Sequence, residues 1–322
     1  MNTFLSKTNV GMIILCSLLC FSGCTKSIIN IDLGDTPNNG TPDNNNNGSG
    51  NTKTSLVTFH ATVESRNMTR SLSPMQKGIA CLIYAYKSPI SSMDDIAEYG
   101  LYVTSSAGIL TGANGYRMYL PTGVYSFYAV SNNSYSTPAQ FTDGISHTLV
   151  NGVDYLWANN KLQDINTEQV SQPITFLHSA TQVVFEISTD PSLKLNQLVS
   201  ATITPSTPGG TMNLSNGTIT PASSYAAPVQ MGINGTLAQY TMLPLSTTAP
   251  MKLVLNVLVN NETVARTYSV DVPVPNGELK SGDSYRFSAV IGTSSVSFSD
   301  VNVVSWTDVD ETGKPLYPRQ QQ

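Results

Sequence analysis

Charged side chains are scarce in this sequence of 322 residues. Asp, Glu, Lys and Arg together make up 11% of it, well below the roughly 25% of an ordinary soluble domain. The net charge is −5, and no cluster of Lys and Arg occurs of the kind that a phosphate-binding surface needs. Nucleic acid is therefore not an expected partner. Thr and Val are abundant instead, and both residue types favour strands.

The motifs of common catalytic and metal sites are absent as well. The three histidines, His60, His147 and His178, do not form the H-E-x-x-H pattern of a zinc helix. No G-x-S-x-G elbow, lysine-containing phosphate loop or G-x-G-x-x-G occurs. Acidic residues within 94–98 and 308–311 lack the EF-hand spacing, so solvated surfaces are the simpler interpretation. We expect no enzyme, no metal and no cofactor. A hydrolase stays a minor alternative, because two catalytic carboxylates can be far apart in the sequence and close together in the fold.

Long hydrophobic runs are lacking, and the one near the N-terminus is short. It covers residues 10–19, follows Lys7 and precedes small residues, which is the layout of a secretory signal. A membrane-spanning helix needs about 20 residues, so a retained signal-anchor helix is the weaker alternative. The predicted signal peptide is residues 1–23.

Cysteine is rare, and Cys24 stands at the predicted cut. A cysteine there resembles the signal of bacterial lipoproteins, in which the thiol is acylated and becomes the first mature residue. Phe21 departs from that pattern, because leucine is commoner at its position. The resemblance implies lipidation of Cys24, for example with palmitate. Cys81 would be the one unlipidated cysteine of the mature chain, and its apolar run predicts a small buried hydrophobe rather than a reactive thiol.

The residues after Cys24 divide into a linker and a folded part. Residues 24–54 are rich in Asn, Gly, Pro and Thr, and such a tract buries too little apolar area to offset the entropy of ordering. We expect a disordered tether there. The remaining length suits about two domains, predicted at residues 55–170 and 171–322.

The folded part shows the alternation of strands and no amphipathic helix of any length. In the first run, Val57, Phe59, Ala61 and Val63 share one face. Further runs follow, and Asn260-Asn261 predicts a tight hairpin between two of them. Residues 91–99 are expected to form a short helix or an ordered loop, and 159–171 a polar stretch. Many short strands without helices predict an all-β fold of sandwiches.

The aromatic residues have two interpretations. Trp157 and Trp306, the two tryptophans, are expected as core anchors, with an exposed sugar-stacking platform as the alternative. Five tyrosines are expected on a recognition surface, where aromatic rings with polar tips are favoured. They are Tyr99, Tyr102, Tyr116, Tyr119 and Tyr135.

Several segments together resemble the fimbrillin superfamily of Bacteroidetes, over about residues 55–313. The segments are Val57–Val63 followed by Met68-Thr69-Arg70, Leu120–Ala129, Asp154–Ala158, Ile174–Phe185, Tyr285–Val290 and Val301–Trp306. The resemblance implies two transthyretin-like Greek-key β-sandwich domains in series and a non-enzymatic pilus subunit or accessory lipoprotein of the outer membrane, cell surface or fimbrium.

The resemblance also implies a mode of assembly. A trypsin-like protease would cut after Arg70, with Arg66 as a competing position, and remove the first strand. A strand from another subunit would then fill the groove left by Val57, Phe59, Ala61 and Val63. The physical basis is strand addition, in which main-chain hydrogen bonds give affinity and side-chain pockets give register. The alternative is that the first strand stays in place permanently.

The C-terminus departs from the pattern of a stalk subunit. Residues 307–322 are polar and contain Pro315 and Pro318. Proline has no backbone N–H to donate to a neighbouring strand, so such a segment pairs poorly in a sheet. This favours a tip, an anchor or a stand-alone adhesin, with residues 296–306 as a donor strand if they detached. The alternative function is a stand-alone surface lipoprotein that binds a glycan or host protein.

Overall fold

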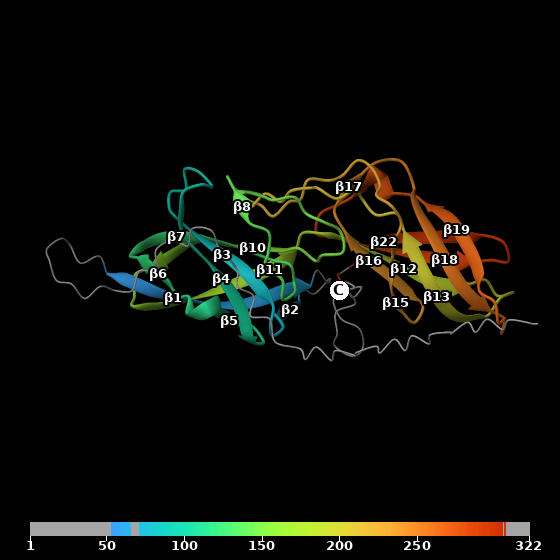
Figure 1. The fold of residues 1–322 in the computed structure, drawn as a ribbon, viewed down its shortest axis with the longest axis horizontal. Helices are drawn as coiled ribbons and strands as arrows, with labels where there is room; N and C mark the ends of the chain where they lie inside the picture. Colours follow the sequence, from blue (N-terminus) through green and yellow to red (C-terminus); the bar gives the residue numbers. More distant parts are fainter. Residues whose placement is uncertain (1–52, 66–70, 305, 307–322) are drawn as a thin grey trace, which may run out of the picture. The chain divides into compact units, whose positions relative to one another are not determined.

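A computed structural model describes residues 53–65, 71–304 and 306, which belong to one compact unit, Gly48–Gln322. Within the described residues, the regular elements are strands and two single-turn 3-10 helices, η1 (Ala113–Gly115) and η2 (Pro275–Gly277) (Figure 1). The all-β fold predicted from the sequence is confirmed.

Nine strands of the first part form one sheet in the order β11-β10-β7-β3-β4-β5-β1-β2, with β6 paired to β1. They are β1 (Thr54–Ser65), β2 (Ser71–Pro74), β3 (Ala80–Lys87), β4 (Ile96–Ser106), β5 (Ile109–Gly112), β6 (Met118–Pro121), β7 (Gly123–Ser131), β10 (Leu156–Ile165) and β11 (Gln169–His178). A parallel pairing of β11 with β1 joins one end of this order to a strand near the other end. The sheet therefore wraps around a single hydrophobic core. A short hairpin of β8 (Phe141–Thr142) and β9 (Ile145–Ser146) lies outside it.

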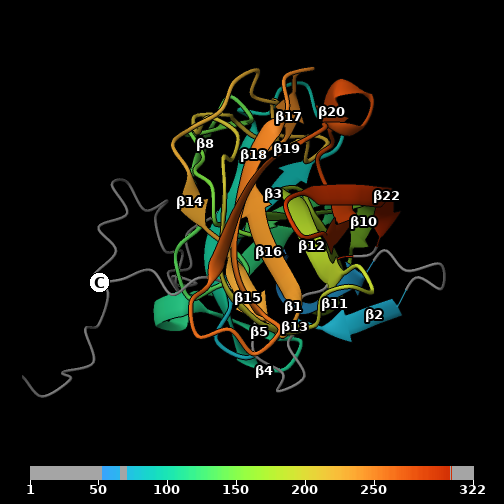
Figure 2. The ribbon, with the colours of Figure 1, turned by 90° about the vertical axis from the view of Figure 1, so that its right-hand side faces the viewer.

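The second part is a sandwich of a five-stranded sheet, β15-β16-β12-β21-β22, and a four-stranded sheet, β14-β13-β18-β19 (Figure 2). The strands are β12 (Thr181–Thr189), β13 (Leu195–Ile203), β14 (Val229–Gln230), β15 (Gly232–Asn234), β16 (Leu237–Met242), β18 (Met251–Val259), β19 (Arg266–Val272), β21 (Ser284–Ile291) and β22 (Val296–Val304). A small pair, β17 (Leu245–Ser246) with β20 (Glu278–Leu279), accompanies them. The second core lies between the two sheets and draws its residues from both.

The alternation of buried apolar residues with more exposed residues explains why these sequences form strands. In β18, every second residue from Met251 to Val259 is fully buried in the second core, while Lys252 between them is exposed. The turn after it contains Asn260 and Asn261 with φ of 51° and 58°, the positive values that a tight two-residue hairpin turn requires. The hairpin itself is confirmed by the pairing of β18 with β19, but the prediction that two residues connect the strands is wrong, because β19 starts at Arg266 and the connection covers residues 260–265.

Two segments differ from the sequence-based expectation. The segment expected as a helix or loop at 91–99 ends in β4, which starts at Ile96 and pairs with β3. The polar stretch expected at 159–171 contains most of β10 and the start of β11. A bulge in β10 between Asn160 and Gln163, with Leu162 at a φ of 57°, shifts the alternation and hides the strand signal.

The boundary between the first and the second core lies C-terminal to the domain boundary predicted at residues 170/171. β11 pairs with β1 and β10, and its Ile174 and Phe176 are buried in the first core. The second core begins with β12, after Ser179 and Ala180. The division into two domains stays a prediction, since the described residues belong to one compact unit.

We expect replacement of Phe59 by Ala to lower the free energy of unfolding by about 3–5 kcal/mol, because a buried aromatic ring leaves a cavity when it is truncated. Phe59 is 1% exposed in the first core. His60, its exposed neighbour on the same strand, provides the matched control, and His60→Ala should change stability by less than about 0.5 kcal/mol. Urea unfolding measures both. Equal effects of the two substitutions would show that β1 does not pack as described.

Candidate functional site

The first strand, β1, occupies an interior position in the sheet. Along one edge it pairs in parallel with β11 at eight positions, from Leu56 opposite Gln169 to Val63 opposite Phe176. Along the other edge it pairs with β6, β5 and β2 in turn. A twelve-residue strand is thus held by backbone hydrogen bonds on both sides.

The four residues predicted to fill a groove do lie together on the core side of β1. Val57, Phe59, Ala61 and Val63 are 2%, 1%, 0% and 9% exposed. The ring of Phe59 meets Tyr102 and Phe127 edge-to-face, with centroids 5.1 and 5.5 Å apart. Such aromatic pairs add to the stabilisation that burial alone provides.

The outward side of β1 is polar and partly exposed. Thr58 donates a hydrogen bond to the carbonyl of Val170 on β11, at 3.4 Å. The hydroxyls of Thr62 and Thr175 lie 3.2 Å apart between the same two strands. His60 is exposed. β1 is therefore apolar toward the core and polar toward solvent, which fixes its register.

The remaining predicted site residues lie outside the described part of the chain. They are Cys24, Arg66 and Arg70. β1 ends at Ser65 and β2 begins at Ser71, so both arginines belong to the connection between these two strands. Their roles stay predictions.

No catalytic arrangement is evident among the described residues. Cys81 is fully buried and free of disulfides, and burial raises the pKa of its thiol, which makes it a poor nucleophile. In the described ranges, no group of three or more His, Cys, Asp or Glu residues could hold a metal ion.

A hydrogen bond with the Asp143 side chain raises the pKa of Asp94. Within the same part of the chain, no helix is long and apolar enough to cross a membrane.

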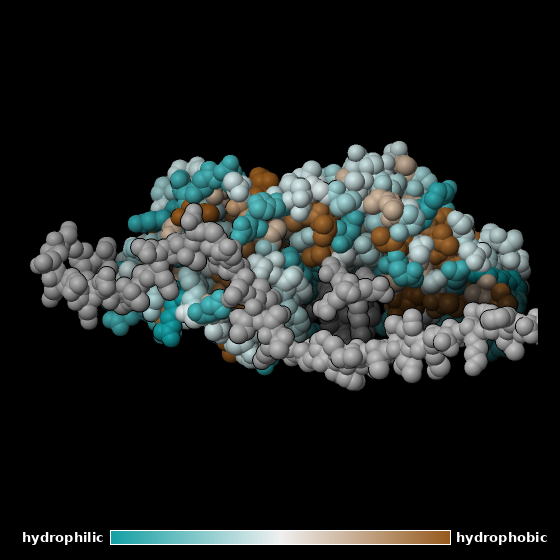
Figure 3. All heavy atoms as spheres, viewed as in Figure 1, coloured by the Kyte–Doolittle hydropathy of each residue, from teal (hydrophilic) through white to brown (hydrophobic). Residues whose placement is uncertain are grey.

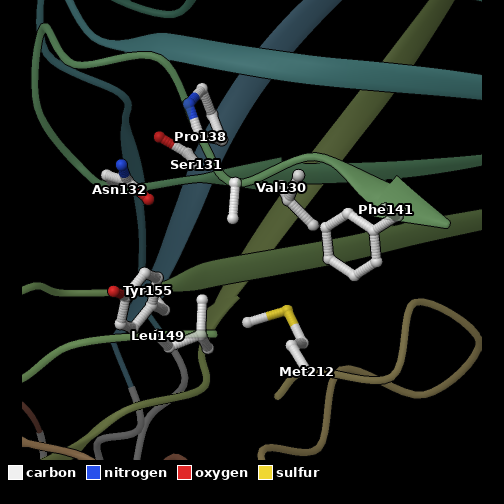
Figure 4. Close-up of a pocket in the computed structure, with 9 residues that line it drawn as sticks. Val130, Ser131, Asn132, Pro138, Phe141, Leu149, Tyr155 and Met212 are labelled. Atoms are coloured by element: carbon white, nitrogen blue, oxygen red, sulfur yellow. The ribbon is translucent and has the colours of Figure 1, made fainter. Parts of the chain in front are cut away.

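One small pocket lies at the end of β7 (Figure 4). Its lining includes Val130, Asn132, Phe141 and Tyr155 from the first part of the chain and Met212 from the second. The free volume is about 10 Å³, room for about one water molecule. The pocket is thus too small to hold an organic ligand without rearrangement.

Sequence analysis did not foresee a buried polar network that joins distant segments. Nδ1 of His178, the last residue of β11, lies 2.8 Å from Oδ1 of Asp154. The other carboxylate oxygen of Asp154 accepts a hydrogen bond from the amide of Asn133 at 2.9 Å. The imidazole stacks on the indole of Trp306, with centroids 4.2 Å apart and planes 5° apart. Asp154 and Trp306 stand 24 and 128 positions from His178 in the sequence, so no local pattern indicates these contacts.

The tryptophans are buried, whereas the expected tyrosine surface is only partly present. Trp157 donates its indole N–H to the carbonyl of Leu214 at 2.7 Å, and both tryptophans serve as core anchors. Tyr102 is 3% exposed in the first core, so its assignment to the surface was wrong, and its strand position beside Phe59 is the reason. Tyr119 and Tyr135 are exposed. Large exposed apolar side chains occur on many separate elements, and the face in Figure 3 mixes hydrophilic and hydrophobic residues.

Comparisons with known proteins give a family and a fold. The family model described as "Fimbrillin-like" matches residues 68–306. No curated protein matches the sequence. The fold is similar to that of a "putative cell adhesion protein" from Bacteroides uniformis, at 20% identity and a TM-score of 0.58, covering 78% of this chain and 98% of that one. Proteins described in the same words from Bacteroides ovatus (15% identity, TM-score 0.59, 79% and 99% covered) and Bacteroides fragilis (14%, 0.53, 78% and 98%) are also similar. At such identities the likeness shows the fold alone.

Proposed function

This chain belongs to the fimbrillin-like family, and on that premise we propose that it is a pilus subunit or accessory lipoprotein that assembles by exchange of its first strand. Family membership supports the coarser description, a fimbrial or adhesin-like surface protein. It also favours a structural role over an enzymatic one. The position of β1 is the observation that carries the finer proposal.

Loss of β1 would create an acceptor for another strand. The eight paired positions of β11 would lose their partner, and so would the facing backbone groups of β6, β5 and β2. Unpaired backbone groups at a sheet edge are a template for pairing with another chain. The space left by Val57, Phe59, Ala61 and Val63 would be apolar, so water would fill it at a cost in free energy. A strand with apolar residues at every second position would satisfy both requirements.

Proteolysis in the connection between β1 and β2 is the proposed trigger. Cleavage after Arg70, or after Arg66, would separate β1 from the rest of the chain. The trigger is needed because β1 is continuous with β2 and makes the antiparallel pairing of Thr62–Ser65 with Ser71–Pro74. An intact connection would return β1 to its place faster than a second copy could enter.

We expect arginine-specific proteolysis of the full chain to permit self-association, seen as larger species in size-exclusion chromatography. An excess of a peptide with the sequence of residues 54–65 should block that association by refilling the groove. The peptide with Phe59→Asp should fail, because its charge would be buried unpaired. The peptide with His60→Asp should work like the parent, since this side chain points outward.

The chain with both Arg66→Gln and Arg70→Gln is the control for cleavage elsewhere, and it should remain monomeric. If the cleaved protein stays monomeric and binds none of the peptides, β1 is a permanent strand and the proposed mode of assembly is wrong.

We propose attachment to the outer membrane through acyl chains on Cys24. Replacement of Cys24 by Ser should move the protein from the membrane fraction to the soluble fraction, because one polypeptide without lipid lacks the proposed anchor. Mass spectrometry of the native protein should find the acyl mass on Cys24, in the intact chain or, after cleavage at Arg66 or Arg70, in the N-terminal fragment. Cys81→Ala, which changes the buried cysteine, should leave the fractionation unaltered. Unchanged fractionation of the Cys24→Ser form would contradict the anchor.

A stand-alone lipoprotein that binds a glycan or host protein is the second candidate. The favouring observation is Tyr135, which is 76% exposed while its ring lies over Gly78. A rigid exposed aromatic ring provides contact area at a low entropic cost. Glycan-array signals that fall at least tenfold in Tyr135→Ala but not in Tyr119→Ala would support it. A silent array, or equal signals for both variants, would argue against binding at this residue.

A further inference from the structure

The last strand, β22, is held along its own length by one neighbouring strand and by half-buried side chains. It lies at the edge of the five-stranded sheet and pairs with β21 alone. None of its residues from Val296 to Val304 is buried. Val296, Phe298 and Val301 are half-buried against the second core, and Val303 is 60% exposed. Such an edge strand gains less from burial than β21, where alternate residues are in the core.

Trp306 lies two positions beyond β22 and is buried at the C-terminal end of the described chain. It is 4% exposed, and its indole N–H donates a hydrogen bond to the carbonyl of Gly282 at 2.9 Å. One face of the indole stacks on His178. The ring of Phe298 on β22 also lies near the core rings of Phe185 and Phe287, with centroids 6.3 Å apart in both pairs. Because an indole buries a large area, Trp306 adds a buried anchor to these half-buried contacts.

The two groups that hold Trp306 belong to different parts of the fold. His178 ends β11 in the first sheet, and its imidazole is held by the carboxylate of Asp154. Gly282 stands in the turn before β21, where its N–H donates to the carbonyl of Ala180. Ser281 in the same turn donates its hydroxyl hydrogen bond to the carbonyl of Ser179. Trp306 therefore contacts both the last residue of β11 and the turn that is hydrogen-bonded to residues 179–180, the connector between the first core and the second.

We propose that Trp306 is a latch that keeps β22 on β21 and must withdraw from His178 before the C-terminal strand can leave. The inference deepens the proposed assembly and rests on it for its biological meaning. Withdrawal would open the edge of β21, Ser284–Ile291, to a strand from a second copy of this chain. It would also expose the stacked face of His178, so release of the strand is coupled to the first sheet. While the latch is closed, β22 covers the backbone groups of β21, which would otherwise be open to pairing with another strand.

Hydrogen exchange of the full chain tests the latch. Trp306→Ala should raise the exchange rate of the β22 amides and of the β21 amides facing them at least tenfold, and leave β13 and β18 unchanged. Trp306→Phe, which keeps a ring against His178, should show a smaller increase. Val303→Ala is the matched control on the same strand and should have no effect.

Trp157→Ala controls for the loss of a buried tryptophan as such. Trp157 is also buried and hydrogen-bonded to a carbonyl, but it comes from β10. Its loss should not raise exchange in β22 selectively. Unchanged β22 exchange in Trp306→Ala would overturn the latch. So would an equal rise across β13, β18 and β22, because Trp306 would then be an ordinary core residue.

A labelled peptide with the sequence of residues 296–306 tests the opened edge. It should bind Trp306→Ala at least tenfold more tightly than the parent chain, and a peptide carrying Trp306→Ala should bind more weakly. Equal binding to both proteins would overturn the proposal. These experiments leave β1 and both arginines intact, so their outcome is independent of whether the first strand exchanges.

Discussion

The structure depends on one constraint, the pairing of β1 on both of its edges while its alternate side chains fill the centre of the first core. The parallel pairing with β11 makes the nine-stranded sheet wrap around that core. Because Phe59 meets Tyr102 of β4 and Phe127 of β7, the strand also holds together elements that do not pair with it. A molecule built in this way needs a strand in that position, and in the proposed assembly another chain supplies it.

The two ends of the described chain are held differently. β1 has buried residues along its whole length and partners on both sides, so it would leave only at a large cost unless cleavage removes its tether. β22 has one partner strand and side chains that are at most half-buried against the second core, and Trp306 beyond its end is the buried side chain that adds to this attachment. The first arrangement suits a groove that opens once, and the second suits a strand that can be released. Only β22 is an edge strand of the kind that proteins must protect from unwanted pairing, whereas β1 would leave unpaired edges only after its removal.

Sequence alone predicted much of this fold, for reasons that individual residues show. The alternation of Val57, Phe59, Ala61 and Val63 identified β1 and its core side, since side chains of a strand repeat every two residues. Asn260-Asn261 identified a hairpin, because few residues tolerate a positive φ. The start of β4 and most of β10 were missed, since pairing partners distant in the sequence decide them and the bulge at Leu162 breaks the alternation. The contact of His178 with Asp154 and Trp306 was equally hidden, because it joins three segments separated by whole strands.

The central claim is that β1 can be replaced by a strand of another copy. A crystal structure of the chain cleaved between β1 and β2 and associated with a second copy tests it most directly. The account predicts a foreign strand that runs parallel to β11, with apolar side chains at the positions of Val57, Phe59, Ala61 and Val63. A structure in which the original β1 still fills these positions and the copies meet elsewhere would contradict it.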